Sequence, residues 1–538
     1  MNLFEAVFAH DPSAPAINYQ GRELTYGELR ARTLRMARAL TSLGVVRGDR
    51  VALLLNDSPE FIEAFIATCS LGAISVPINM ALRIDEQCSI LHNCGATLAL
   101  VEDDICNTLL TDAREKLHGL KTIVRTDRDN DIYEIERNLS EEGSGDFFCI
   151  TEEVLRDPPL TIYSLMGLLD EAKAAPALRF SAPEVDDPAF ILYTSGSTGE
   201  PKGAVHRQTD IFYTNQTYCR EVLRVTKDDR LFSSSRLPFA YGLGNSFTFP
   251  LLNGATTILC HEKPTPDLIA NILATARPTI FFAVPVVYNL LLDHHRTGKQ
   301  LDCSSLRLCV SAGEALPAHL GEEWEREFGV QLLDGIGSTE MLHMFMSNHE
   351  NDVRYGSSGR MLEGYEARLV DENGTLTPDG VEGNLWIKGD SASRYYWERP
   401  EASAETFVDG WVRTGDLYRR DSDGYWFHMG RSDDCFKSSG QWVSPVEVEG
   451  VLLRHAGVSR AAVVEDFDDH QLPCACAFVV RQDVESDAVE LEKGLRETAA
   501  ASLPRFKQPR KYVFVDELPY TATGKIQRFK LRQSLRKS

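Results

Sequence analysis

Short apolar runs alternate with segments of helical apolar spacing from the N-terminus as far as Gly430. The run "RVALLLNDS" at 50–58 predicts a buried strand, and in the following "PEFIEAFIATCSLGA" apolar residues recur every third or fourth position. Asp57 or Ser58 can cap that helix. The runs "GAISVPIN", "ATLALVED", "ILYTSG" and "LRLCVSAGEALP" repeat the strand signal. Alternation on this scale predicts an α/β fold in which parallel-type sheets are covered by helices.

The pattern changes after the polar turn "GRSDD" at 430–434. Beyond it come two apolar strand signals, "RAAVVED" and "CAFVV", a helical stretch "DAVELEKGLRETAAA" and a basic end. A chain of 538 residues is longer than one hydrophobic core supports, so at least two domains are expected. We therefore predict a large N-terminal domain and a small α+β domain on a hinge. The acidic stretch 126–160 is expected to be a mobile surface excursion.

The charge balance excludes several classes of partner. The chain carries 79 acidic against 56 basic residues, a net charge of −23, which disfavours binding to nucleic acid or to an anionic membrane.

The 12 cysteines lack metal-ligand spacing, and "PCACA" at 473–477 has no second pair, so reduced, buried thiols are expected. The sequence shows neither a secretory leader nor an apolar run of about 20 residues, so we expect a cytoplasmic protein.

The segment "TSGSTGEPKGA" at 194–204 follows one predicted strand directly. Glycines let backbone amides approach an anion, hydroxyls add donors, and Lys202 adds a positive charge. The P-loop pattern does not fit, because Lys202 follows Pro201 and Gly203 stands where a metal-binding hydroxyl is required. We interpret the segment as a phosphate-binding loop of another kind; a plain flexible turn is the alternative. Its candidate ligands are Thr194, Ser195, Gly196, Ser197, Thr198, Gly199 and Lys202.

Further motifs follow at wide intervals. "DGIGSTEM" at 334–341 carries the carboxylate of Glu340 beside Ser338 and Thr339. "WVRTGD" ends at Asp416, "GRSDD" supplies Arg431, and "YTATGKIQR" places Lys525 in a second Thr/Gly loop. In this order and with these intervals the motifs resemble those of the adenylate-forming superfamily, which contains acyl-CoA synthetases, peptide-synthetase adenylation domains and luciferases. The resemblance covers nearly the whole chain.

The resemblance implies roles in binding ATP that suit the chemistry of the residues. The loop at 194–203 would hold the β- and γ-phosphates of ATP, and Thr339 would form hydrogen bonds to the phosphates. Glu340 would hold Mg²⁺, which favours carboxylate oxygen as a ligand. Asp416 would accept hydrogen bonds from the ribose hydroxyls, and Arg431 would reinforce that side. Many relatives place an aromatic ring on adenine where this chain has Ile336. The residues of the implied adenine and phosphate contacts are Gly313, Glu314, Ala315, Asp334, Gly335, Ile336 and Ser338.

Lys525 is the implied catalytic residue, together with Thr339 and Glu340. Attack of a carboxylate on the α-phosphate brings two anions together, and a cation that spans them stabilises the transition state more than the ground state. The alternative is an ordinary surface lysine in the basic tail.

The resemblance also implies a hinge at Asp433, between a large domain over 1–432, with the ATP and acid sites, and a small mobile domain over 433–538. Lys525 would face the site during adenylation. The segment "FKSSGQWVSP" at 436–445, with Lys437 and Gly440, would then swing in to form a tunnel for the CoA arm. A plain turn glycine is the alternative for Gly440.

The segment "RLPFAYGLGNSFTFP" at 236–250 corresponds to the lining of the acyl pocket in this superfamily. Relatives that activate amino acids carry an aspartate after the Phe, whereas Ala240 stands here, so no carboxylate waits for an ammonium group. A bulky Tyr241 argues against a long fatty chain, and His343 is either a contact to a ring substituent or a structural histidine. The pocket candidates are Ala240, Tyr241, Gly242, Gly337, His343 and Met344.

Five segments together look most like benzoate-CoA ligases and related aryl-CoA ligases: "FAYGLGN", "GSTEMLH", "VRYGSSG", "RYYW" and "GRSDDCFKSSGQWVSP". Met344, however, stands where benzoate ligases tend to carry a branched aliphatic residue. We therefore expect an ATP-, Mg²⁺- and CoA-dependent ligase for an aromatic acid of the benzoate, anthranilate or hydroxybenzoate type. One alternative loads the acid onto a carrier-protein phosphopantetheine, which is disfavoured because the sequence ends soon after Arg528 without a carrier domain. The other is a non-catalytic nucleotide-binding protein. Monomer and homodimer both stay open.

Overall fold

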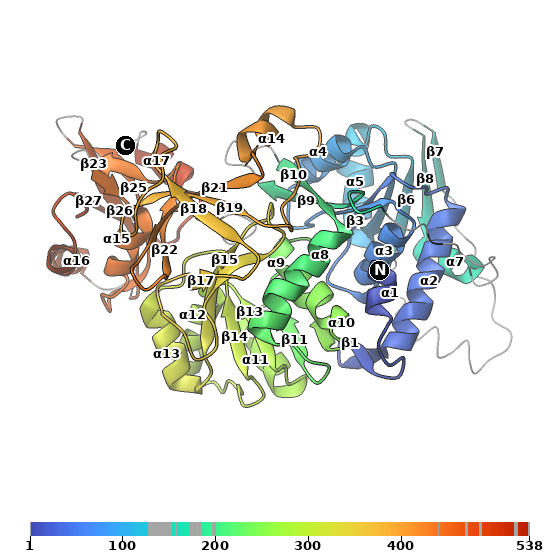
Figure 1. Cartoon of the computed structure of the whole chain (residues 1–538), viewed down its shortest axis with the longest axis horizontal. Coiled ribbons are helices and arrows are strands. Elements are labelled where there is room, and N and C mark those ends of the chain that lie inside the picture. Colours follow the sequence, from blue (N-terminus) through green and yellow to red (C-terminus); the bar gives the residue numbers. More distant parts are fainter. Residues whose placement is uncertain are drawn as a thin grey trace.

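The computed structural model describes residues 2–126, 153–156, 159–172, 180, 184–195, 201–438, 441–468, 472–483, 487–520 and 526–535. These residues form two large sheets with helices on their faces, a smaller antiparallel sheet, and a C-terminal unit of strands and helices, which lies at the left of Figure 1. The predicted large α/β domain with parallel sheets and the smaller C-terminal domain are thus both present. The exact boundary between 1–432 and 433–538 stays a prediction.

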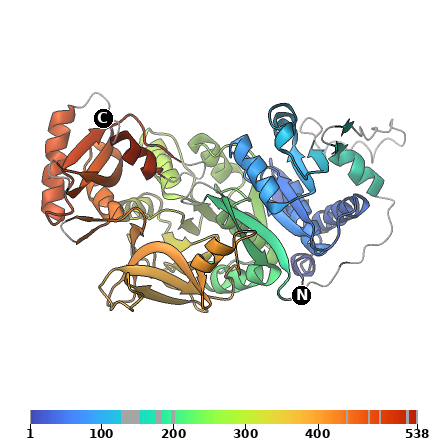
Figure 2. The ribbon, with the colours of Figure 1, turned by 90° about the horizontal axis from the view of Figure 1, so that it is seen from above.

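Helices connect most of the parallel strands, and in Figure 2 they flank the N-terminal sheets on both sides. The α-helices before the C-terminal unit are α1 (Leu3–Val7), α2 (Tyr26–Ser42), α3 (Pro59–Ser70), α4 (Ile84–Cys94), α5 (Asp103–Asp112), α7 (Leu165–Glu171), α8 (Gln208–Thr214), α9 (Ala240–Leu243), α10 (Phe249–Leu252), α11 (Pro266–Thr275), α12 (Pro285–Arg296), α13 (Ala318–Phe328) and α14 (Pro400–Thr406). Shorter segments are the 3₁₀ turn η1 (Arg114–Lys116) and the π-helical η3 (Asn215–Leu223) and η4 (Gly244–Thr248).

The first large sheet has eight described strands, parallel in its interior and antiparallel at both edges. In spatial order they are β10 (Pro201–Arg207), β9 (Pro188–Ser195), β4 (Ile74–Pro77), β3 (Arg50–Leu54), β5 (Leu98–Glu102), β6 (Thr122–Thr126), β8 (Pro159–Ser164) and β7 (Glu153–Arg156). Because side chains of a strand alternate between faces, Leu53 packs in the core with α2 and α3, while Leu54 packs in the core with α4 and α5.

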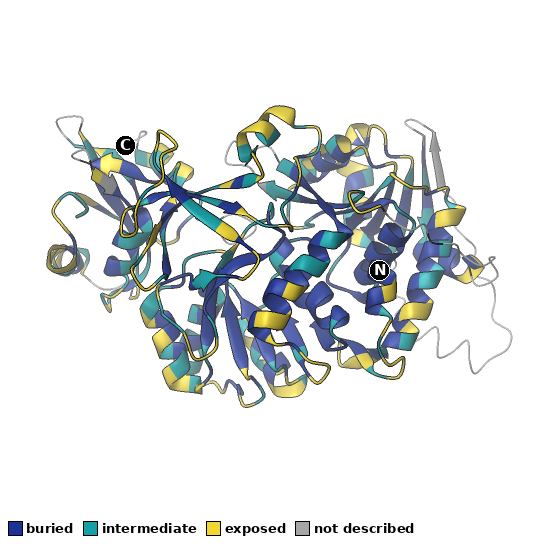
Figure 3. Ribbon diagram, viewed as in Figure 1, coloured by how far each residue is buried: buried dark blue, intermediate teal, exposed yellow. Residues whose placement is uncertain are grey.

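The second large sheet has nine described strands and is built in the same way. In spatial order they are β17 (Arg360–Met361), β16 (Met344–Ser347), β15 (Leu332–Gly337), β14 (Leu308–Ser311), β13 (Ile280–Ala283), β11 (Arg230–Ser233), β12 (Thr256–Leu259), β1 (Pro15–Tyr19) and β2 (Arg22–Thr25). Phe281 faces the core formed with α11–α13, and Phe282 faces the core shared with η3. Figure 3 shows these strands as mostly buried and the outer faces of the helices as exposed.

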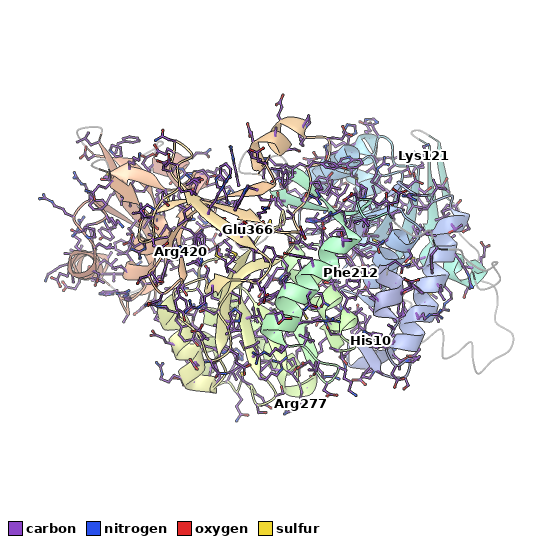
Figure 4. All side chains as sticks on the ribbon, in the orientation of Figure 1. His10, Lys121, Phe212, Arg277, Glu366 and Arg420 are labelled. Atoms are coloured by element: carbon purple, nitrogen blue, oxygen red, sulfur yellow. The ribbon has the colours of Figure 1, made fainter. Side chains whose placement is uncertain are left out.

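The third sheet departs from the expected parallel arrangement, because all its neighbouring strands pair antiparallel. Its strands are β18 (Glu366–Val370), β19 (Gly383–Lys388), β20 (Phe407–Val408), β21 (Trp411–Arg420) and β22 (Trp426–Arg431). Glu366 and Arg420 are labelled in Figure 4. Glu366 forms an ion pair with Lys388, and Arg420 forms one with Asp379. The sheet lies between the N-terminal sheets and the C-terminal unit in Figure 1.

The C-terminal unit contains both strand signals and the helix predicted for it. Its strands are β23 (Phe436–Ser438), β24 (Gln441–Val443), β25 (Val458–Phe467), β26 (Pro473–Arg481) and β27 (Lys511–Phe514), and its helices are α15 (Pro445–Leu452), α16 (Ala488–Ser502) and α17 (Arg528–Leu535). No described helix is long and apolar enough to cross a membrane.

Two local expectations need correction. Ser58 occupies the N-cap of α3 but makes no side-chain capping bond, and the Asp57 carboxylate instead accepts the N–H of Leu237 at 3.0 Å. The stretch 126–160 is not wholly a surface excursion, because β7 pairs with β8 at the sheet edge. The alternating apolar residues of β8 bury Leu160 and Ile162 and so favour a strand there. Residues 127–152 lie outside the described residues.

Candidate active site

The phosphate-loop candidates belong to the hairpin of β9 and β10, whose register places Thr194 opposite Lys202. Lys202 projects its Nζ over the ring of Tyr396, 5.5 Å from the ring centroid. Ser195 ends β9. Gly196, Ser197, Thr198 and Gly199 lie outside the described residues. The described part therefore fixes the two ends of the loop.

The "DGIGSTEM" motif begins inside β15 and leaves it at Gly337, at the carboxyl end of a strand that pairs in parallel with β14. Such strand ends are where α/β sheets usually bind ligands. The carbonyl of Thr339 accepts a hydrogen bond from Nε2 of His206 at 2.8 Å, and Nδ1 of the same ring lies 3.0 Å from Oδ2 of Asp210. Because both His206 and Asp210 are fully buried, this pair holds the Thr339 backbone in place.

Glu340, the predicted Mg²⁺ ligand, accepts a hydrogen bond from the Tyr396 hydroxyl at 2.6 Å. The Glu340 backbone carbonyl also accepts the N–H of Ser393 at 2.7 Å. The described residues contain no cluster of three or more His, Cys, Asp or Glu side chains that could hold a metal by itself. A single carboxylate still suits Mg²⁺, which usually takes one or two protein carboxylates and fills its other positions with phosphate oxygens and water.

The predicted adenine contacts come together at one sheet edge. Ser311 at the end of β14 pairs with Asp334 of β15, so the following segment Gly313–Ala315 runs beside Gly335 and Ile336. Burial raises the pKa of Asp334 well above its usual value. The edge therefore combines a deeply buried carboxyl group with an aliphatic side chain.

The predicted ribose contacts face each other across two strands of the third sheet. Asp416 on β21 and Arg431 on β22 are cross-strand partners, and Nη1 of Arg431 lies 3.3 Å from Oδ1 of Asp416. Nε2 of His428 lies 3.5 Å from the same carboxylate oxygen. Burial lowers the pKa of Arg431, but the carboxylates of Asp416, Asp433 and Glu340 together outweigh burial and raise it, so the guanidinium stays charged.

The aryl-pocket candidates gather around His343. Its ring centroid lies 5.6 Å from that of Tyr241 on α9 and 4.5 Å from that of Phe249, and Nε2 lies 3.2 Å from Oδ1 of Asn245. Burial lowers the pKa of His343 to about 3, so the ring is neutral. Ala240 and Met344 are buried beside this group.

Two glycines in this pocket are required by close backbone contacts. A Cβ at Gly337 would lie 2.5 Å from the carbonyl oxygen of His343, and a Cβ at Gly242 would lie 2.0 Å from that of Arg236. Neither position leaves room for any side chain, so both glycines shape the backbone rather than contact a ligand by a side chain.

The C-terminal residues are only partly described. Asp433 lies 3.6 Å from Arg431, and Lys437 on β23 forms an ion pair of 2.8 Å with Glu372 in the β18–β19 turn. Gly440 and Lys525 lie outside the described residues. The residues on either side of the Lys525 segment are described, however, and they come close to the predicted adenine edge.

Burial raises the pKa of Tyr520, and the charge of Glu314 adds to the shift. Burial lowers the pKa of Arg528, but the carboxylates of Glu449, Asp434 and Glu314 outweigh it. Tyr520, just before the 521–525 segment, and Arg528, three residues after it, are therefore both within electrostatic reach of Glu314 in the large domain.

The sequence did not single out three residues that complete the site. Tyr396 contacts Glu340, His206 fixes Thr339, and His428 approaches Asp416. Tyr396 stands in the segment "RYYW" at 394–397, which served only for the family resemblance and was given no role in the site. His206 and His428 had no distinctive spacing to mark them.

Comparison with known proteins matches nearly the whole chain. Residues 4–397 match the model of the AMP-binding enzyme family, and residues 447–525 match that of the AMP-binding enzyme C-terminal domain. The benzoate–CoA ligase of Thauera aromatica is 39% identical over 512 residues, covering 95% of this chain and 90% of the relative.

Two further relatives extend the range of acids. The 4-hydroxybenzoate–CoA/benzoate–CoA ligase of Rhodopseudomonas palustris is 35% identical over 517 residues, covering 95% of this chain and 89% of the relative. The crystal structure of an anthranilate CoA ligase in complex with anthranoyl-AMP has a TM-score of 0.87 and 35% identity, covering 99% of this chain and 97% of that chain.

Proposed function

The chain belongs to the AMP-binding enzyme family, and from this premise we propose that it is an aryl-CoA ligase. It would join a small aromatic carboxylic acid to CoA at the expense of ATP. In the first step the carboxylate attacks the α-phosphate of ATP, forming an acyl-adenylate and releasing pyrophosphate. In the second step the CoA thiol attacks the acyl carbonyl, forming the thioester and releasing AMP. Benzoate, hydroxybenzoates and anthranilate are the candidate acids, because these are the acids named for the similar proteins.

The group around His343 is the observation that carries the choice of substrate class. Tyr241 and Phe249 surround a histidine ring that is uncharged because its pKa is about 3, and Ala240 offers no charge. Aromatic rings pack favourably against one another in offset or edge-to-face geometry. An uncharged ring of modest size therefore suits this pocket better than an amino acid with its ammonium group.

The described geometry supports the following proposed contacts to ATP. Asp416 would accept hydrogen bonds from the ribose hydroxyls, and Arg431 would hold the Asp416 carboxylate in place. The edge formed by Gly313–Ala315 and Asp334–Ile336 would hold the adenine. Thr339, fixed by His206, and Lys202 would contact the phosphates.

Glu340 would hold Mg²⁺, which when bound neutralises phosphate charge. Lys525 would bridge the acid and the α-phosphate as charge builds there. Its flanking residues Tyr520 and Arg528 lie near Glu314, which supports an approach to the adenylation site. For the second step we propose that the small domain turns about Asp433 and brings Lys437 and Gly440 to the CoA path. The Lys437–Glu372 ion pair would then have to open.

The proposal is tested by measuring pyrophosphate release over a panel of aromatic and aliphatic acids, with mass spectrometry of the products. We expect release with benzoate-type acids and a CoA thioester among the products. Transfer to a carrier-protein phosphopantetheine but not to CoA would instead identify a carrier-loading enzyme. Nucleotide binding without pyrophosphate release for any acid would identify a non-catalytic protein.

A further inference from the structure

Tyr396 connects two parts of the proposed ATP site. Its hydroxyl donates to Oε1 of Glu340 at 2.6 Å, and Nζ of Lys202 lies 5.5 Å from its ring centroid. Tyr396 also forms an antiparallel bridge with Ala204 on β10, the strand that returns from the phosphate loop. The backbone of Tyr396 is thus tied to the loop strand while its hydroxyl is tied to the carboxylate.

The Tyr396 hydroxyl is the donor in this contact, because an ionised carboxylate oxygen can only accept. A hydrogen bond of this length from a hydroxyl to a carboxylate belongs to the strong, charge-assisted class. It therefore restricts a side chain that would otherwise rotate about several bonds.

We propose that Tyr396 is a positioning residue for Mg²⁺: by holding Oε1 of Glu340 it presents the other carboxylate oxygen to the metal on the ATP phosphates. Carboxylates that bind metals are usually held by hydrogen bonds of their own, and loss of such a partner typically weakens metal binding about 10- to 100-fold. The inference rests on the proposed function, in which Glu340 is the metal ligand. Because Tyr396 is anchored on β10, it also couples the position of Glu340 to the phosphate loop.

The neighbouring tyrosine provides a matched control. The side chain of Tyr395 is 39% exposed, whereas that of Tyr396 is 5% exposed. Tyr395→Phe removes one hydroxyl from the same segment and leaves the contact with Glu340 intact. Tyr396→Phe keeps the ring that packs 5.1 Å from Phe407, so the fold should be retained.

The direct test is a titration of Mn²⁺ into the full-length protein with ATP and without acid, followed by electron paramagnetic resonance. We expect Tyr396→Phe to weaken Mn²⁺ binding about 10- to 100-fold and Tyr395→Phe to leave it unchanged. Thioester formation from a supplied aryl-adenylate and CoA should stay at the wild-type rate in both variants. A general structural defect would lower that rate too, and this outcome would overturn a positioning role.

Equal Mn²⁺ affinity in wild type and Tyr396→Phe, in a wild-type protein that releases pyrophosphate with an aromatic acid, would overturn the inference alone. A wild type that releases no pyrophosphate with any acid would overturn the proposed function itself. Should Tyr396→Phe fail to fold, Thr406→Val removes the hydroxyl that hydrogen-bonds to Tyr396 and is expected to weaken Mn²⁺ binding in the same direction. Unchanged binding in that variant would count against the inference.

Discussion

Tyr241 and Tyr288 donate their hydroxyl hydrogens to the same acceptor, the carbonyl oxygen of Val310, at 3.2 Å and 2.9 Å. Tyr288 belongs to the core of α11–α13, whereas Tyr241 packs against the core that contains His343's neighbour Phe249. One strand end thus anchors a purely structural tyrosine and a tyrosine of the proposed acid pocket. The pair provides a variant and its control for the size limit of the acid.

Tyr241→Ala is expected to relax the size limit of the proposed acid pocket. Removal of a ring that lies 5.6 Å from the His343 ring opens space beside the substrate. The ratio of kcat/KM for an acid extended by one or two methylenes to that for benzoate should rise by about 10-fold or more. Pyrophosphate release over a series of substituted acids measures this ratio.

Tyr288 lies outside the proposed pocket, and Tyr288→Phe removes the other hydroxyl that donates to the Val310 carbonyl. This control should leave the ratio of the two kcat/KM values unchanged. An unchanged ratio in Tyr241→Ala would place the acid elsewhere.

Asp416→Asn is expected to raise the KM for ATP by about 10- to 100-fold, because hydrogen bonds to a charged acceptor contribute more than neutral ones. The cross-strand contact with Arg431 should keep β21 and β22 paired, so the fold should persist. Steady-state kinetics at varied ATP measures the effect.

Asp409→Asn is the matched control, because Asp409 lies in an exposed turn with φ of 52°, which asparagine also tolerates. If Asp416→Asn raised only the KM for the acid, its assignment to the ribose would be wrong.

The buried His343 should make the folded state less stable at mildly acidic pH. Burial lowers its pKa from 6.5 to about 3, so between these values the unfolded chain takes up a proton that the folded chain does not. The free energy of unfolding therefore falls as the pH falls through this window, by about 2 kcal/mol between neutral pH and pH ~5.

Urea unfolding of the wild type and His343→Gln at the two pH values measures this difference. The buried carboxyl groups of Asp57 and Glu63, whose pKa values are raised to about 6 and about 7, shift stability in the opposite direction, but they are common to both proteins and cancel. Equal pH dependence in the two proteins would show that His343 titrates normally.

The alternating pattern of the sequence was sufficient to predict parallel sheets covered by helices, because strands such as β3 are short continuous apolar runs, whereas in helices such as α3 apolar residues recur every third or fourth position. The third sheet was not predicted. One face of this sheet lies in the core with Leu369 and Leu385, and on the other face Arg368 of β18 stacks on its cross-strand partner Trp386 of β19. These antiparallel strands lack the alternation of strand and helix from which the parallel sheets were predicted.

The same limit applies to the site. Motif residues such as Glu340 and Asp416 could be named from local sequence, and their roles stay predictions. The contacts that hold them could not be named, because Tyr396 is 56 positions from Glu340 and His206 is 133 positions from Thr339. Spacing predicts which residues share a helix face or strand end, whereas these contacts arise only when β10 pairs with the Tyr396 segment.

Lys525→Ala is expected to abolish adenylation and to leave thioester formation from a supplied aryl-adenylate and CoA largely intact. Tyr520 precedes the 521–525 segment and Arg528 follows it by three residues, and the charge of Glu314 at the proposed adenine edge acts on both. A lysine there can offset charge as the carboxylate approaches the α-phosphate, but it has no such task once the adenylate exists. Lys530→Ala, at an exposed position on α17, is the control and should retain both steps. Single-turnover assays of each half-reaction separate the two effects, and loss of both steps in a folded Lys525→Ala protein would contradict a two-orientation mechanism.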